Sequence, residues 1–147
     1  MPIFKEAGPL KLDPEIEKKA LAKLEQNICE LPVKIESIYF DYDCKAISLP
    51  CDAIITLNKD QKSIAVHYVD QDNKKQKLCS CRYTDRYPTL EIIRKTNTSF
   101  ELHLGPIEVL KLSAETHVDR DVIAISVRMF NRAHVQKEVQ QLKVRFL

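Results

Sequence analysis

Apolar and polar residues alternate in one short segment after another between Val33 and Phe130. A period of two is typical of strands that bury one face. Turns rich in Asn and Asp, such as 58–61 and 71–74, separate the segments. Successive short strands of this kind predict a mostly antiparallel sheet. The expected strands are 33–40, 53–57, 62–69, 75–83, 90–95, 99–104 and 107–112, with a short edge piece at 47–50.

The segment Asp121–Phe130 has the clearest alternation in the chain. Ile123, Ile125, Val127 and Met129 fall on one side of the pattern, and Ala124, Ser126 and Arg128 on the other. We therefore expect 121–130 to be the last strand, with Ile125 and Val127 almost fully buried.

Two helices are expected at the ends of this region. Asp13 can cap a helix that begins at Pro14, and Ile16, Ala20, Leu24, Ile28 and Leu31 form an apolar stripe up to Pro32, so the first helix is predicted over 14–30. The second is predicted over 132–145, with Asn131 as its cap and an apolar seam of Val135, Val139, Leu142 and Phe146. The alternative for this end is a strand through Leu142, Val144 and Phe146.

The expected fold class is α+β, mostly an antiparallel sheet in a small barrel or sandwich of about seven strands, with an N-terminal and a C-terminal helix. The interpretation is a single domain over 1–147, with an N-terminal arm at 1–12, the helix 14–30, an antiparallel β region at 33–130 and the helix 132–145. This order resembles the pleckstrin-homology-like superfold, in which a helix closes a seven-stranded barrel. The resemblance concerns element order and assigns no ligand.

Composition narrows the class of protein. Of 147 residues, 44% are hydrophobic and 30% charged, so the chain can bury a core. No apolar run approaches the ~20 residues that span a bilayer. Five cysteines cannot all pair within one chain, and the N-terminus has no export signal, so we expect thiols in a reducing, cytoplasmic compartment. Two glycines are too few for a glycine-rich phosphate loop.

No catalytic or metal-binding motif stands out in the sequence. The pairs Cys44/Cys51 and Cys79/Cys81 lack the spacing of a structural zinc site, so we expect inert thiols and neither metal nor cofactor. An enzyme would have to assemble its site from residues distant in sequence, such as Asp41, Asp43 or His117.

Positive charge gathers in residues 74–95, where seven basic side chains stand against two acidic ones, a net charge of +5. If the strand 75–83 is regular, Lys75, Lys77 and Tyr83 lie on one side of it and Arg82 on the other, whereas a bulge would break this alignment. The candidate partner-binding residues are Lys75, Lys77, Arg82, Tyr83, Arg86 and Arg94.

One short pattern in this region resembles a known family. The run from Arg82 to Arg86 resembles the Arg-x-x-x-Arg motif of cyclic-dinucleotide-binding PilZ domains, and 97–99 resembles the start of their second motif. Leu102 stands where that motif has glycine, and the gap between the two motifs is short, so we assign no family.

The sequence therefore predicts a non-enzymatic binding or adaptor domain that makes protein–protein contact through the basic face at 74–95. One alternative is a nucleic-acid-binding protein that uses the same face and its aromatic residues. The other is a small enzyme built on Asp41, Asp43 or His117.

Overall fold

A computed structural model describes residues 13–40, 47–85, 88–92, 98–105 and 107–146, and for 91, 92 and 135–146 it describes the backbone alone. The N-terminal arm expected at 1–12 lies outside these ranges, as do residues 41–46, which precede the expected edge piece at 47–50. Residues 47–50 are described and are not a strand.

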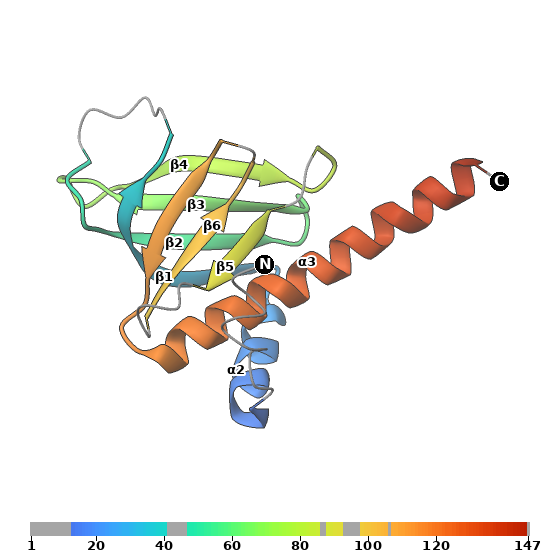
Figure 1. The fold of residues 1–147 in the computed structure, drawn as a ribbon, viewed down its shortest axis with the longest axis horizontal. Helices are drawn as coiled ribbons and strands as arrows, with labels where there is room; N and C mark the ends of the chain where they lie inside the picture. The colour runs from blue at the N-terminus through green and yellow to red at the C-terminus, as the bar shows by residue number, and fades with distance from the viewer. Residues whose placement is uncertain (1–12, 41–46, 86–87, 93–97, 106, 147) are drawn as a thin grey trace.

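The described chain consists of one helix, seven strands and a second helix (Figure 1). This confirms the α+β class and the seven-stranded antiparallel sheet. The elements are α2 (Pro14–Leu24), β1 (Ile28–Ile38), β2 (Cys51–Asn58), β3 (Ser63–Val69), β4 (Lys75–Arg82), β5 (Thr89–Ile92), β6 (Ser99–His103), β7 (Val109–Ser113) and α3 (His117–Phe146).

The strands form one sheet in the order β4-β3-β2-β1-β7-β6-β5. β1 belongs to both halves, because residues 28–35 pair with β2 and residues 34–38 pair with β7. The register shifts between Ile35 and Ser37, so Glu36 is a bulge residue at the point where β1 passes from one half to the other. Figure 1 shows the consequence: β5 and β6 cross over β2 and β3 at a steep angle.

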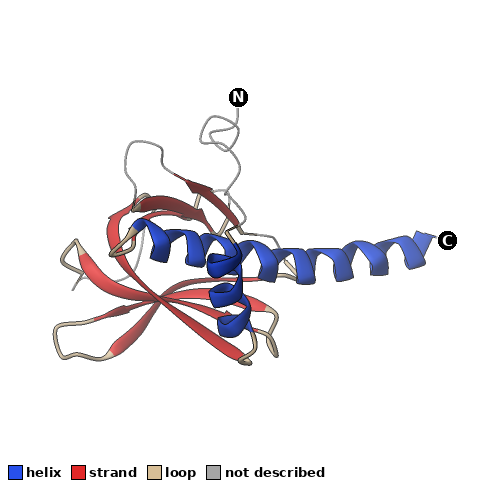
Figure 2. Ribbon diagram, turned by 90° about the horizontal axis from the view of Figure 1, so that it is seen from below, coloured by secondary structure: helices blue, strands red, loops and turns tan. Residues whose placement is uncertain are grey.

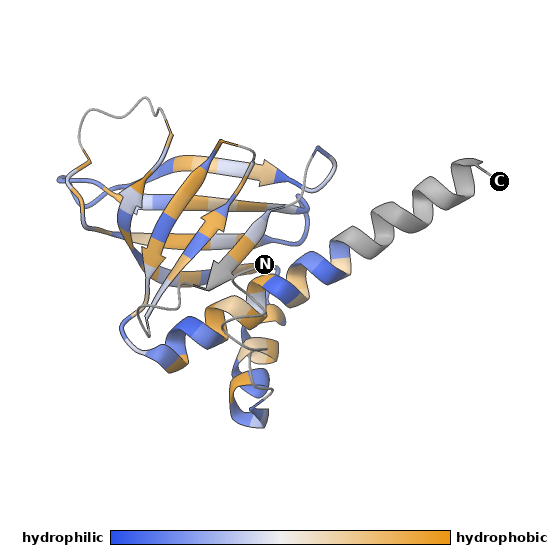
Figure 3. Cartoon of the chain, viewed as in Figure 1, coloured by the Kyte–Doolittle hydropathy of each residue, from blue (hydrophilic) through white to orange (hydrophobic). Residues whose placement is uncertain are grey.

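One large core fills the space between the two halves of the sheet. On β1 its side chains are Cys29, Leu31, Val33 and Ile35, which alternate with exposed residues. Leu110 and Leu112 of β7 contribute from the other half. Figure 3 shows the same alternation of apolar and polar residues along the strands.

The segment 121–130 is helical, so the prediction of a last strand there was wrong. Thr116 caps the helix: its hydroxyl accepts a hydrogen bond from the backbone N–H of Asp119 at 3.1 Å. Ile125 and Val127 are buried as expected, with 6% and 0% exposure, but they lie on different sides of α3.

The strand prediction failed because α3 is buried on two sides. Val127 and Phe130 pack into the sheet core, whereas Val122 and Ile125 pack against Ile16 and Ala20 of α2. Figure 2 shows α3 lying across the sheet, with α2 crossing it on the side away from the strands. A helix covered on two sides carries apolar residues almost continuously and loses the one-sided stripe by which helices are recognised.

The first helix ends at Leu24, not at residue 30, and the β region spans 28–113, not 33–130. From Ile28 onward the burial follows a period of two, with Ile28 half exposed and Cys29 buried. Pro32 does not end the helix but lies within β1, where the strand has a partner on one side only.

The predicted helix 132–145 is confirmed as part of α3, and the alternative strand there was wrong. The helix starts fifteen residues earlier than expected, at His117, so Asn131 is an interior helical residue and not a cap. Within the described ranges, neither helix is long and apolar enough to cross a bilayer.

Candidate binding surface

β4 lies at one end of the sheet and pairs with β3. Its register shifts opposite Val66 and His67, so that Val66 pairs with Cys79 and His67 with Lys77, and Leu78 is the extra residue of a bulge. The bulge separates odd-numbered residues that a regular strand would have kept on one face. Lys75 and Lys77 therefore lie on the outer face and Tyr83 does not join them, which is the outcome expected for a bulged strand.

The inner side of β4 belongs to the core. Cys79 and Cys81 are buried, and Tyr83, one residue past the strand, is 1% exposed. Burial raises the pKa of the Tyr83 hydroxyl well above its ordinary value. Because its ring is buried, Tyr83 cannot stack on a nucleobase. The basic face therefore lacks the stacking residue that the nucleic-acid alternative assumed.

Tyr83 connects the end of β4 to α3. Its hydroxyl donates to the Asn131 side-chain oxygen, and the Asn131 amide donates to the Pro88 carbonyl at 3.2 Å. Its ring lies 5.5 Å from Phe130 and 5.2 Å from His134, centroid to centroid. The contacts with Phe130 and His134 are aromatic packing at a helix–sheet junction.

A polar strip crosses the outer face of the β1–β4 half of the sheet. Lys75 of β4 donates to Glu30 of β1 at 3.1 Å, and both side chains remain about half exposed. Between them, the Thr56 hydroxyl of β2 lies 3.3 Å from Nδ1 of His67 on β3. We call Glu30, Thr56, His67, Lys75 and Lys77 the outer strip.

The pKa of His67 reflects the charges of the outer strip. Its pKa is lowered, first by partial burial and then by the positive charges of Lys75 and Lys77, while Glu30 opposes the shift. The two lysines are thus close enough to His67 to act on it. At neutral pH the strip is positive at β4 and negative at β1.

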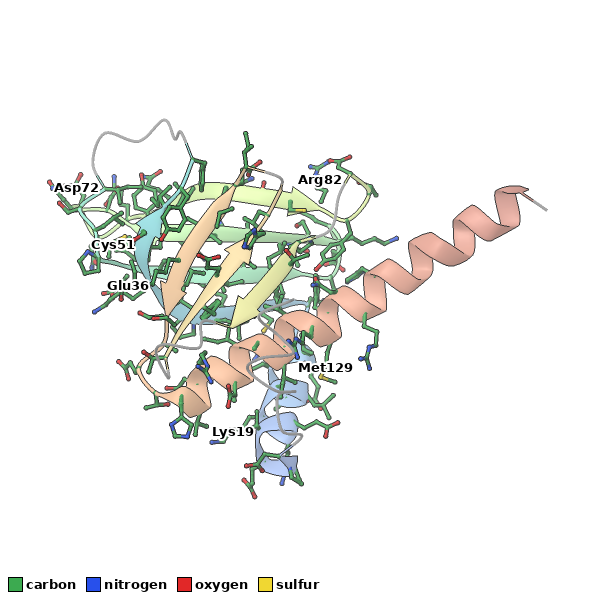
Figure 4. The ribbon with its side chains drawn as sticks, viewed as in Figure 1. Lys19, Glu36, Cys51, Asp72, Arg82 and Met129 are labelled. Carbon is green, nitrogen blue, oxygen red and sulfur yellow. The ribbon has the colours of Figure 1, made fainter. Side chains whose placement is uncertain are left out.

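The other predicted residues are spread out or lie outside the described ranges. Arg82 is exposed on the outer side at the far end of β4, on the order of 15 Å along the strand from Lys77. Figure 4 shows Arg82 and Asp72 at opposite ends of β4. Arg86 and Arg94 lie outside the described residues.

Acidic side chains lie just before the basic stretch, in the β3–β4 turn. The Asp70 carboxylate accepts hydrogen bonds from the backbone N–H groups of Asp72 and Lys74 and from the Gln76 amide. These bonds, the one from Lys74 first, lower the pKa of Asp70. They also hold the β3–β4 turn, in which Asn73 takes a φ of 64° that a glycine would otherwise supply.

The enzyme alternative gains no catalytic geometry from the described residues. His117 is exposed at the first residue of α3, and Asp41 and Asp43 fall outside the described ranges. Where side chains are described, no group of three or more His, Cys, Asp or Glu could hold a metal ion. Cys29, Cys79 and Cys81 are buried and Cys51 is partly so, as expected of thiols in and beside a core.

The sequence did not single out Glu30, Thr56 and His67 as partners of the lysines. These residues come from strands far apart in the sequence, and the diagonal alignment depends on the twist and on the bulge at Leu78. His67 itself alternates with the apolar residues Val66 and Tyr68, which is typical of an outer-side residue, but the neighbours of its side chain cannot be inferred from that pattern.

No protein-family model matches the sequence, and no curated protein matches it. Among solved structures, one similar chain belongs to the crystal structure of human RhoA in complex with the DH/PH fragment of PDZRHOGEF, with a TM-score of 0.49 and 15% sequence identity. The similarity covers 71% of this chain and 28% of that chain, so this chain spans less than a third of that chain's length.

Proposed function

We propose that this chain is a non-enzymatic binding domain that contacts a protein partner through the outer face of β4. Lys75, Lys77 and Arg82 supply the basic part of the contact. One observation carries the proposal: among the described residues, Lys77 and Arg82 are exposed and make no ion pair. Their charges therefore have no partner in the described part of the fold, while Cys79 and Cys81 on the inner side of the same strand pack in the core.

The arrangement favours a protein partner over a nucleic acid. The outer strip carries charges of both signs, because Glu30 pairs with Lys75, and two further carboxylates, Asp70 and Asp72, lie in the neighbouring β3–β4 turn. A polyanion would be repelled by those carboxylates, whereas a protein surface can match both signs. Our proposal also places the domain in the cytoplasm, where buried thiols persist.

Affinity capture from native lysate tests the proposal. The bait is the full chain, and capture is run with and without nuclease. We expect a protein partner whose capture survives nuclease and is lost with Lys75→Glu/Lys77→Glu. The matched control is Lys18→Glu/Lys19→Glu, which makes the same charge change on the exposed side of α2 (Figure 4).

Three results would contradict the proposal. Capture that disappears with nuclease would assign the surface to nucleic acid. Equal loss in both charge-reversed variants would show a response to net charge alone. Capture unaffected by Lys75→Glu/Lys77→Glu would move the contact to another surface.

A further inference from the structure

A groove lies on the outside of the sheet at the corner where β1 changes partners. Its volume is about 550 Å³, within the range of binding pockets in proteins. β1 contributes Pro32, Val33, Lys34 and Glu36, β2 and β3 contribute Asp52, Ala53, Ile54 and Val69, and the end of β7, its connection to α3 and the first turn of α3 contribute Ser113, Ala114, Glu115 and Asp119.

The groove combines apolar side chains with a surplus of carboxylates. Its apolar residues are Val33 and Ala53, which are buried, and Pro32, Ile54, Val69 and Ala114, which are at least partly exposed. Around them are four acidic residues and one basic residue, namely Glu36, Asp52, Glu115, Asp119 and Lys34. An exposed apolar surface with a mainly acidic rim fits a ligand that is both apolar and positively charged.

The fold accounts for some of these carboxylates but not for all of them. Glu36 accepts a hydrogen bond from the Ser113 hydroxyl at 2.7 Å, which ties the β1 bulge to the end of β7. Asp119 lies in the first turn of α3, where a negative charge is favourable. Within the described part of the chain, Asp52 and Glu115 make no ion pair and serve no cap.

We propose that this groove docks a segment of a partner protein in which lysine or arginine residues flank an apolar side chain. The apolar side chain covers Ile54 and Pro32, and the basic side chains meet Asp52 on one wall and Glu115 on the other. Charge complementarity identifies the occupant. A neutral segment would leave the carboxylates of the rim without a partner, and an acidic segment would add further negative charge beside them.

The groove is next to the outer strip but distinct from it. Val69 of the groove pairs with Lys75, and Ile54 pairs with His67. The two surfaces have opposite charge, so each selects its own ligand chemistry. Docking in the groove therefore does not depend on the contact proposed for β4.

Titration of the full chain with a fluorescein-labelled peptide, Lys-Leu-Arg-Val-Lys, tests the proposal by anisotropy at physiological salt. We expect saturable binding that weakens by about tenfold or more in Asp52→Lys/Glu115→Lys, since paired charges are lost at the contact. The control Glu25→Lys/Asp60→Lys reverses two exposed carboxylates elsewhere and should bind like wild type. Ile54→Thr keeps a β-branched residue and should weaken binding by removing apolar surface.

Four outcomes would overturn the docking proposal. The first is no saturable binding by wild type, and the second is equal loss in Asp52→Lys/Glu115→Lys and its control. The third is equal affinity for a peptide with serine in place of leucine and valine, or for spermine. The fourth is a wild-type chain that self-associates in analytical ultracentrifugation while Asp52→Lys/Glu115→Lys is monomeric. The occupant of the groove would then be a second copy of this chain.

Discussion

The two sides of β4 differ sharply in burial and in charge. The inner side places Cys79, Cys81 and Tyr83 in the core and against α3. The outer side exposes Lys75 and Lys77 to solvent beside His67. One strand thus supplies packing on one side and charge on the other, and substitutions on the two sides should have separable effects on stability and on binding.

The largest expected effect comes from removing the Tyr83 ring. Tyr83→Ala deletes a buried aromatic side chain that packs on Phe130 and His134. We expect the free energy of unfolding to fall by about 3–5 kcal/mol, because burial is lost and a cavity remains. Chemical denaturation monitored by circular dichroism measures this. A change below about 1 kcal/mol would show that the junction of β4 and α3 is not part of the core.

A smaller loss should follow from removing the Tyr83 hydroxyl alone. Tyr83→Phe keeps the ring but deprives the Asn131 side-chain oxygen of its donor. We expect a loss of about 1–2 kcal/mol, since a partly buried acceptor is left without its bond. Asn131→Ala in the same background should then cost less than in wild type. Additive losses would contradict a direct bond between the two side chains.

On the outer side, the Lys75–Glu30 pair should contribute little to stability. Both side chains are about half exposed, so solvent screens the attraction. A double-mutant cycle with Lys75→Ala and Glu30→Ala should give a coupling energy below about 1 kcal/mol. A larger coupling would mean that the outer strip helps to hold the sheet together, and the contrast between the two sides would fail.

The smallest expected effect is a pH dependence due to His67. Its pKa in the folded chain lies below the ordinary value of 6.5, so the unfolded chain takes up the proton first as pH falls. This contribution to stability is complete above pH 6.5 and decreases as pH falls through 6.5 towards the folded pKa. The melting temperature of wild type should therefore drop slightly more than that of His67→Gln between neutral and mildly acidic pH. Equal decreases in the melting temperatures of wild type and His67→Gln would contradict a lowered pKa of His67 in the folded chain.

Most strands could be predicted from the sequence because alternation on a half-buried sheet is a local signal. Ser63–Val69 and Lys75–Arg82 match the expected segments 62–69 and 75–83 to within a residue or so. The helix over Asp121–Phe130 could not be predicted in this way, because burial between two layers erases the one-sided apolar stripe. The cap Thr116, followed three residues later by Asp119, was the local signal that could have revealed the helix.

The candidate surface could be predicted only in part. Composition located the basic stretch, and alternation alone would have grouped Tyr83 with Lys75 and Lys77. A single extra residue at Leu78 reverses that grouping, and no local feature of the sequence marks the bulge. The groove was not anticipated at all, because its residues come from β1, β2, β3 and the β7–α3 connection.

The most direct test compares stability and binding in one variant, Lys75→Glu/Lys77→Glu. Its thermal melt and its calorimetric affinity for the protein captured by wild type are measured side by side, with Lys18→Glu/Lys19→Glu as the control. The division of β4 into a packed side and a binding side predicts an unchanged melt and an affinity lower by about tenfold or more. An unchanged affinity, or an affinity lost together with the fold, would contradict it.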